Sequence, residues 1–171
     1  MTDKPRIYVA CLAAYNNGHL HGAWIDATEG EWAIETDIQT ILASSPIAAA
    51  EEWAIHDHEG FEGLEVSEYA GVATVVRLAR FVSEHCAKGV AVAEYYGGDL
   101  DEAEEALSDR YLGCYASTAD YLEEVMGETA SVHESLRFYI DWAAMARDAE
   151  LNGDLLSIEG GDSEVYVFAG G

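Results

Sequence analysis

Basic residues are the scarcest class in this sequence. Its 171 residues include 8 lysines and arginines against 33 aspartates and glutamates, so the net charge is −25. Direct binding to nucleic acid is therefore disfavoured, because neutralising phosphates requires clusters of Lys and Arg. Enzymes that act on anionic substrates are disfavoured for the same electrostatic reason.

Cysteines are also few, and they lie far apart at Cys11, Cys86 and Cys114. Their odd number and the lack of a CxxC pair argue against both a zinc knuckle and a disulfide framework. No signal-peptide pattern and no apolar run of 18 residues occurs. We therefore expect a protein of the reducing cytoplasm that is not inserted in a membrane.

Signatures of catalysis are missing as well. The sequence has no G-x-S-x-G elbow, no P-loop and no G-x-G-x-x-G after a strand. No pair of carboxylates stands out as a glycosidase pair. The exception is His19-x-His21 with His56-x-His58, which would place imidazoles on one side of a strand and could bind zinc or iron. Since no third ligand follows at a recognisable spacing, we predict no metal, no cofactor and no catalytic residue.

Apolar side chains and acids are what the sequence has in abundance. Half of the residues are hydrophobic and 11% are aromatic, which is enough to bury a core and too many for a disordered chain. A charge of −25 equals that of about 40 Å of duplex DNA, and a compact chain of this length would be roughly 40 Å across. Solubility alone, or adaptation to high salt, would also explain such an excess.

The N-terminal part has the pattern of a small antiparallel sheet. Residues 6–15 and 19–26 indicate two strands, and Asn16-Asn17-Gly18 is typical of a hairpin turn between them. A short helix is expected over 37–43. Residues 53–58 could continue the preceding Ala-rich stretch as a helix or form a third strand, and we predict the strand because a lone hairpin is only marginally stable.

Helical patterns dominate the middle of the chain. Apolar spacing predicts a helix from Ser67, its N-cap, to about Cys86, with Gly89 as an interruption. Three capping patterns predict helices over 99–109, 117–126 and 131–152. Strand character returns over 155–158 and 165–168, joined by a Gly-Gly-Asp-Ser turn.

This order of elements predicts an α+β fold with an N-terminal antiparallel sheet, a helical middle and a mixed α/β C-terminal region. We divide the chain into a β-rich domain (1–61), a helical domain (62–103) and an α+β domain (104–171). Domains this small must bury surface against one another or against a partner subunit.

Eleven acids lie between residues 94 and 128, where Arg110 is the only basic residue. Asp101 and Glu105, and likewise Glu105 and Asp109, share a helix face, although such like-charge pairs cost a few tenths of a kcal/mol. Carboxylates four residues apart lie about 6 Å apart along a helix, close to the roughly 6.8 Å of two phosphate steps. A solvated helix face would show the same spacing. The candidate acidic surface comprises Glu94, Asp99, Asp101, Glu102, Glu104, Glu105, Asp109, Asp120, Glu123, Glu124 and Glu128.

Four segments resemble the ArdA antirestriction proteins in the expected order. They are PRIYVACLAAYNNG (5–18), GAWID (22–26), EWAIHDHEGF (52–61) and YIDWAAMARD (139–148). The likeness runs over nearly the whole chain. Single short fragments would be weak evidence, whereas this ordered set is specific.

The resemblance implies an elongated protein of three small domains that forms a homodimer through its C-terminal domain and is carried on mobile genetic elements. Such proteins inhibit type I restriction-modification enzymes by imitating bent B-form DNA, with surface carboxylates in place of phosphates. The resemblance implies no catalytic residue, no cofactor, and neither nucleic acid nor membrane as partner. The family's antirestriction motif would fall between residues 121 and 139. Tyr121, Tyr139 and Trp142 are candidate dimer contacts, with core packing as the alternative.

Two other functions remain open from the residues themselves. An acidic chaperone or antagonist of other basic DNA-binding proteins would need the same charge. A metal-dependent enzyme would use the paired histidines.

Overall fold

The computed structural model describes residues 4–129, 132–161 and 163–171. Contacts within the chain form two compact units, Met1–Cys86 (unit 1) and Ala87–Gly171 (unit 2). Each unit contains helices and a three-stranded antiparallel sheet, so the predicted α+β fold is confirmed. The helical middle and the mixed C-terminal region are also as predicted, while the division into three domains stays a prediction.

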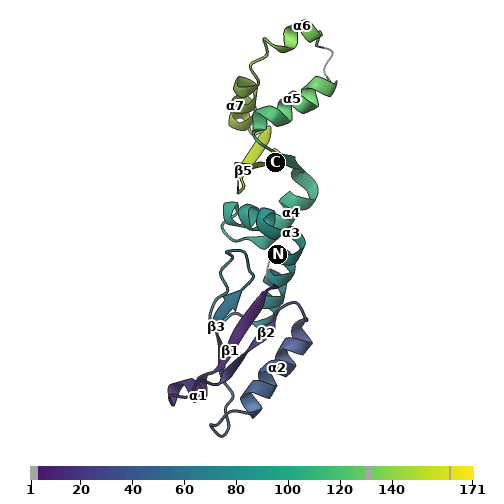
Figure 1. Cartoon of the computed structure of the whole chain (residues 1–171). Helices are drawn as coiled ribbons and strands as arrows, with labels where there is room; N and C mark the ends of the chain where they lie inside the picture. The colour runs from purple at the N-terminus through teal and green to yellow at the C-terminus, as the bar shows by residue number, and fades with distance from the viewer. Residues whose placement is uncertain (1–3, 130–131, 162) are drawn as a thin grey trace. The chain divides into compact units, whose positions relative to one another are not determined.

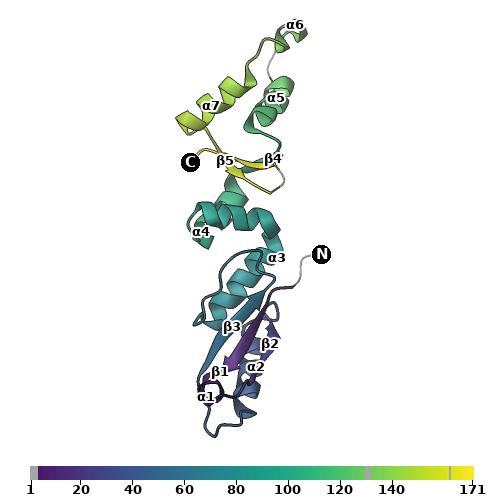
Figure 2. The ribbon, with the colours of Figure 1, turned by 60° about the vertical axis from the view of Figure 1, so that its left-hand side comes forward.

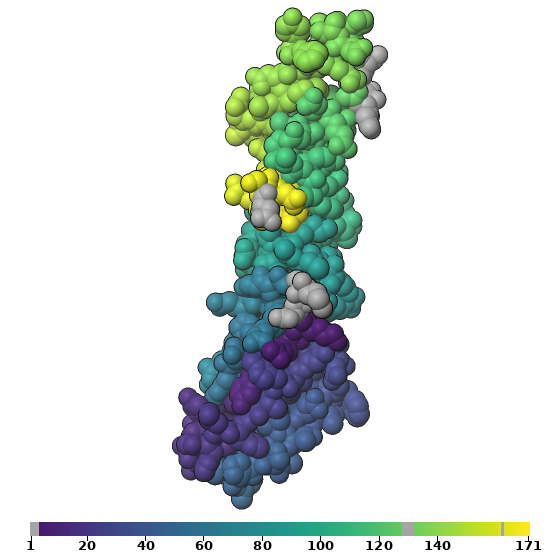
Figure 3. Space-filling model, in the orientation of Figure 1, coloured from purple at the N-terminus to yellow at the C-terminus, as the bar shows by residue number. Residues whose placement is uncertain are grey.

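Unit 1 is a sheet in the order β2-β1-β3 with helix α2 packed against it (Figures 1 and 2). Ile7 and Val9 of the central strand and Ile34 and Ile38 of α2 are fully or almost fully buried between them. In Figure 3, purple atoms from the start of the chain lie against blue atoms from later in it, as the pairing of β1 with β3 requires. The elements are β1 (Arg6–Cys11), α1 (Leu12–Asn16), β2 (Gly22–Asp26), α2 (Glu31–Ala43), β3 (Trp53–Glu59) and the first part of α3 (Val72–Tyr95).

The predicted first strand is too long. Residues Leu12–Asn16 form helix α1, so β1 and β2 are not joined by a two-residue hairpin turn. The apolar run at 6–15 lacks strict alternation and also suits a helical turn, in which Ala14 is buried. The second strand begins only at Gly22, whose missing Cβ would otherwise meet the Val9 carbonyl. The third strand is confirmed as β3.

The predicted boundaries of helices α2 and α3 also change. Helix α2 begins at Glu31, six residues before the expected 37. Helix α3 begins at Val72, so Ser67 is not its N-cap. Gly89 does not interrupt α3: it is buried within the helix, and the break falls at Cys86, where φ is 51° and ψ is −148°.

Unit 2 is built on a sheet in the order β4-β6-β5. Val167 and Phe168 of the central strand point to opposite faces and are 0% and 1% exposed, so both faces of β6 are covered. Helix α5 leads away from the sheet to α6, and α7 returns (Figures 1 and 2). The elements after α3 are α4 (Leu100–Glu105), the π-helical η1 (Ala106–Arg110), β4 (Tyr111–Tyr115), α5 (Thr118–Thr129), α6 (Glu134–Arg137), α7 (Trp142–Asn152), β5 (Leu155–Glu159) and β6 (Val165–Ala169).

Two of the three capping predictions are confirmed. The Asp99 carboxylate accepts bonds from the backbone N–H groups of Asp101 and Glu102, and Ser117 accepts one from the Asp120 N–H at 3.1 Å. The single helix predicted over 131–152 is wrong, because it is divided into α6 and α7. The side chains that cap these two helices are His133 and Asp141. The proposed cap at Ser131 and the Asp162 of the expected turn lie outside the described residues.

Candidate acidic surface

Carboxylates and the apolar core are separated in the described parts of the chain. Every described carboxylate is exposed except that of Asp26, which is half-buried. Thr118 is the one buried polar residue among those described, and the remaining buried side chains are apolar. The acidic excess of the sequence therefore lies on the surface.

Helix α4 directs its acids outward by its own periodicity. Leu100, Ala103 and Ala106 are buried, and the acids between and after them, Asp101, Glu102, Glu104 and Glu105, are exposed. The Asp99 cap and the acids of the first turn lie at the positive end of the helix dipole. This placement offsets part of the repulsion between like charges four residues apart.

The acidic surface continues onto η1, where Asp109 is exposed and accepts a bond of 2.8 Å from the Ser108 hydroxyl. Beyond strand β4, Asp120, Glu123 and Glu124 are exposed on α5, and Glu94 is exposed near the end of α3. The side chain of Glu128 lies outside the described residues. All predicted acids that are described are thus exposed. Those from 99 to 109 follow one another along the N-cap of α4, α4 itself and η1.

Three basic side chains of unit 2 are directed at rings or at a carbonyl. The guanidinium of Arg110, the only basic residue within the acidic interval, lies 5.8 Å from the Tyr96 ring centroid. Lys88 Nζ lies 4.1 Å from the Tyr111 centroid, and Arg137 donates to the Gly127 carbonyl at 2.6 Å. These contacts engage the cations by cation–π attraction and hydrogen bonding.

Sequence reasoning missed a second acidic surface, in unit 1. No Lys or Arg occurs between Arg6 and Arg77, although this interval contains twelve acids. The signal that could have revealed these acids is the long interval without a basic residue, which is easier to recognise in the sequence than the density of acids. These acids are Asp26, Glu29, Glu31, Glu35, Asp37, Glu51, Glu52, Asp57, Glu59, Glu62, Glu65 and Glu68.

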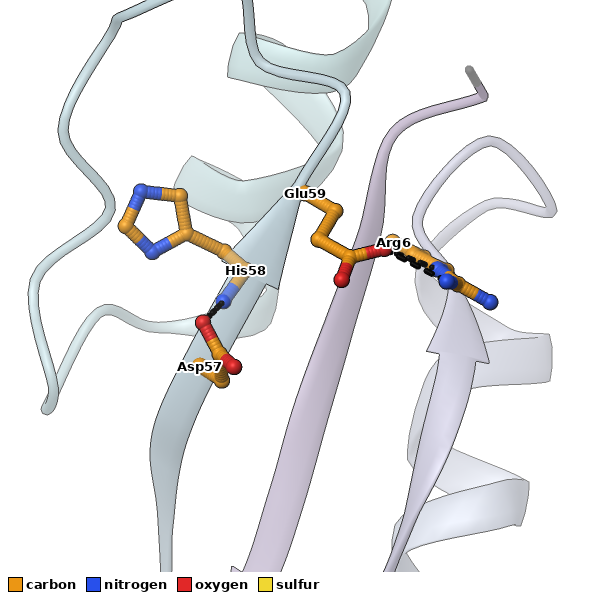
Figure 4. Close-up of polar contacts among 4 residues, drawn as sticks. All are labelled: Arg6, Asp57, His58 and Glu59. Atoms are coloured by element: carbon orange, nitrogen blue, oxygen red, sulfur yellow. Dashed lines mark hydrogen bonds and ion pairs between the residues drawn. The ribbon is translucent and has the colours of Figure 1, made fainter.

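The open face of the unit 1 sheet contributes three of these acids. Arg6 pairs across the strands with Asp26 on β2 and Glu59 on β3, and Tyr8 in turn pairs with Trp24 and Asp57. Arg6 Nε donates to the Glu59 carboxylate at 2.8 Å (Figure 4). The same figure shows the Asp57 carboxylate accepting the backbone N–H of His58.

Asp26 links this face to acid stability. Its carboxylate accepts bonds from the Thr28 hydroxyl and backbone N–H and lies 3.7 Å from Lys4 Nζ. The bond from the Thr28 hydroxyl is the main cause that lowers the pKa of Asp26 below its ordinary value, against partial desolvation. A carboxyl group whose pKa is lowered by folding stabilises the protein at pH values above the pKa of that group in the unfolded chain. This stabilisation is lost as the pH falls through the pKa of the group in the folded protein.

We therefore expect the Asp26→Asn variant to be less stable than the parent at neutral pH, with the difference shrinking below about pH 4. Urea unfolding across pH 3–7 measures this difference in the free energy of unfolding. The matched control is Asp37→Asn, which removes the same charge from an exposed position on α2. A difference for Asp26→Asn that stays constant with pH would contradict the assignment.

The thiol of Cys114 is arranged to stay protonated. Its Sγ lies 3.3 Å from a carboxylate oxygen of Glu164. Desolvation, followed by the bond and charge of Glu164, raises the pKa of the Cys114 thiol. Since the thiolate is the nucleophilic form, this site does not favour nucleophilic catalysis.

The two histidine pairs have separate packing roles. His19 and His21 precede β2, so they do not share a strand face as expected. His21 Nε2 bonds the Ile41 carbonyl at 2.7 Å, His56 packs on Tyr15 and His58 on Phe61. Among the described residues, no group of three or more metal-ligating side chains occurs.

The candidate dimer contacts differ in exposure. Tyr121 is half-buried, with its ring 5.2 Å from that of Tyr115, and Trp142 is also half-buried. Tyr139 is 85% exposed, and its neighbour Phe138, which sequence reasoning did not single out, is 96% exposed. Of the three candidates, Tyr139 is thus the one whose ring is most open to solvent.

Fold and surface together define an acidic α+β protein that holds its carboxylates outward on helices and on an open sheet face. A scan against family models matches residues 7–164 to the model described as antirestriction protein (ArdA). The chain belongs to the ArdA antirestriction family. A search of curated proteins gives no match. Within the described residues, no helix combines the length and the apolar character that crossing a bilayer requires.

Proposed function

We propose that this antirestriction protein acts without catalysis, as a mimic of DNA that occupies the DNA-binding groove of a type I restriction-modification enzyme in the cytoplasm. The observation that carries the proposal is the run of exposed acids on α4 and η1, in the sequence interval 94–128 whose only basic residue, Arg110, is directed at Tyr96. A surface needed only for solubility would mix charges of both signs.

Spacing supports the comparison with a phosphate backbone. Acids one helical turn apart on α4 lie about 6 Å apart along the axis, and two phosphate steps on one strand span roughly 6.8 Å. Arginine and lysine side chains that clamp phosphates also bind carboxylates. Because side-chain carboxylates condense fewer counterions than DNA does, complementary shape must supply part of the affinity.

Competition with DNA tests this function directly. Purified protein should displace a labelled duplex from a type I enzyme and block cleavage at micromolar concentration or below. Displacement should weaken as salt increases, because exposed charges are screened beyond about 8 Å at physiological ionic strength. Lack of inhibition at micromolar concentration would refute the mimic. Equal binding to several unrelated basic DNA-binding proteins would support a general antagonist instead.

A homodimer through unit 2 is part of the proposal. Leu136, Phe138 and Tyr139 are 56%, 96% and 85% exposed around α6 and the residues after it. Covering such apolar surface stabilises an association at roughly 25 cal/mol per Å². A second copy of the chain would cover it and extend the acidic surface beyond one subunit.

Tyr139→Asp should therefore convert a dimer into a monomer, because burying an unpaired carboxylate in an apolar contact is costly. Sedimentation velocity at micromolar concentration measures the change. Leu20→Asp, which adds the same charge at a site 90% exposed in unit 1, should leave the dimer intact. If the parent protein sediments as a monomer, the dimer hypothesis is refuted, whereas the proposed mimicry of DNA is unaffected.

A further inference from the structure

Unit 1 already contains one complete site for an arginine side chain, filled by its own Arg6. The Arg6 guanidinium carbon lies 4.7 Å from the Trp24 ring centroid. Its Nε donates to the Glu59 carboxylate at 2.8 Å (Figure 4). An indole face and a carboxylate thus hold one guanidinium by cation–π attraction and a charge-assisted hydrogen bond.

A second indole and carboxylate pair lies open on the same unit. A groove of about 490 Å³ beside helix α2 is lined by Trp32, Glu35 and Gln39 of that helix and by Trp53 of β3. Trp32 and Glu35 are neighbours on one helix face, with Cβ atoms about 5–6 Å apart. Trp32 is 80% exposed, although burying an indole is favourable.

No Lys or Arg among the described residues of unit 1 occupies this groove. Neither Lys nor Arg lines it, and the interval from Arg6 to Arg77 that contains α2 and β3 has no basic residue. Within the described parts of the chain, Glu35 has neither a hydrogen bond nor an ion pair. The groove therefore has the two components of the Arg6 site and lacks its cation.

We propose that the groove of Trp32, Glu35 and Trp53 binds an arginine side chain of the target enzyme, with the guanidinium against the Trp32 indole and paired with Glu35. The inference rests on the proposed function, because a DNA-binding groove is where a type I enzyme would present arginines to a mimic. It adds a contact that DNA cannot make, since the groove offers an aromatic face beside its negative charge. Arginine fits better than lysine, because its planar guanidinium stacks on an indole while donating sideways.

Trp32→Ala tests the aromatic part without changing the charge. We expect about 10-fold weaker competition for the type I enzyme, which is typical of an aromatic anchor, and an unchanged melting temperature because the side chain is exposed. Leu20→Ala, which removes another exposed apolar side chain from unit 1, should change competition less than 2-fold. Equal competition by Trp32→Ala and the parent would overturn the proposal.

Glu35→Gln tests the carboxylate against a matched loss of charge. It should weaken competition several-fold more than Glu31→Gln, which neutralises an exposed acid on the same helix outside the groove. Equal effects of the two variants would mean that only net charge matters. That result would refute arginine binding in the groove and would leave the proposed mimicry of DNA unaffected.

A direct probe separates the groove from the proposed function. Acetyl-arginine amide, titrated into ¹⁵N-labelled protein, should shift the indole signals of Trp32 and Trp53 in a saturable way, and Glu35→Gln should abolish the saturation. Trp24 is the internal control, because Arg6 already covers it. Acetyl-citrulline amide, which is uncharged, should have no such effect. Shifts of equal size with both probes would refute arginine binding in the groove, even if the protein inhibits the enzyme. Saturable arginine binding without inhibition of the enzyme would instead refute the type I enzyme as the target.

Discussion

Replacing Glu102, Glu105 and Asp109 by Gln, Gln and Asn should weaken inhibition of a type I enzyme by about 3- to 150-fold. Each carboxylate is exposed on α4 or η1, and an exposed ion pair contributes about 0.2–1 kcal/mol. Three pairs lost together thus cost about 0.6–3 kcal/mol, which corresponds to a roughly 3- to 150-fold change in affinity. Asp99 stays in place, so the helix cap is preserved. Competition against labelled duplex measures the effect.

The loss should be gradual across single, double and triple variants, because the acids act through their summed field. A collapse caused by one carboxylate alone would point to catalysis. The matched control is Asp148→Asn with Asp154→Asn and Glu159→Gln, which removes three exposed charges elsewhere in unit 2. If that control weakens inhibition equally, total charge rather than the candidate acidic surface is responsible.

Phe168→Ala should cost unit 2 about 3–5 kcal/mol of unfolding free energy. The ring is 1% exposed on the central strand β6 and lies 5.4 Å from that of Tyr111. Domains are stable by only about 5–15 kcal/mol, so one such cavity removes much of the margin. Urea denaturation followed by circular dichroism measures the loss, and inhibition should disappear at temperatures where unit 2 unfolds.

Tyr69→Ala provides the comparison for this core variant. Its side chain is 72% exposed in unit 1, so truncation should change stability by no more than about 0.5 kcal/mol. Phe168→Leu should recover part of the loss, because it leaves a smaller cavity. Unchanged stability of Phe168→Ala would show that β6 does not form the centre of this core.

Local chemistry explains which elements could be predicted from the sequence. Asp99 and Ser117 start their helices as expected, because a capping side chain acts within three residues of itself. Strand β4 was not predicted: it has five residues, and Gly113 weakens its strand signal. The structure gives the reason for this glycine, whose φ is 153° and whose missing Cβ would lie 2.6 Å from the Tyr115 ring.

The candidate site likewise has one part that could be predicted from the sequence and one part that could not. Outward acids could be predicted, since Asp and Glu are almost never fully buried unless paired. The direction of Arg110 could not, because it depends on Tyr96, which lies in the turn after α3. The groove of Trp32, Glu35 and Trp53 likewise forms only when β3 packs beside α2. Contacts between distant segments carry no periodic signal in the sequence.

The interval without bases between Arg6 and Arg77 also decides how this surface can be mapped in a complex. A protease that cleaves after Lys and Arg would release residues 7–77 as a single large peptide, and amine-directed cross-linkers would find only Lys4 and Lys88 as side-chain anchors. Footprinting the bound protein therefore calls for reagents that modify carboxylates and for cleavage at acidic residues. With them, the carboxylates that form the contact are also the ones that report it.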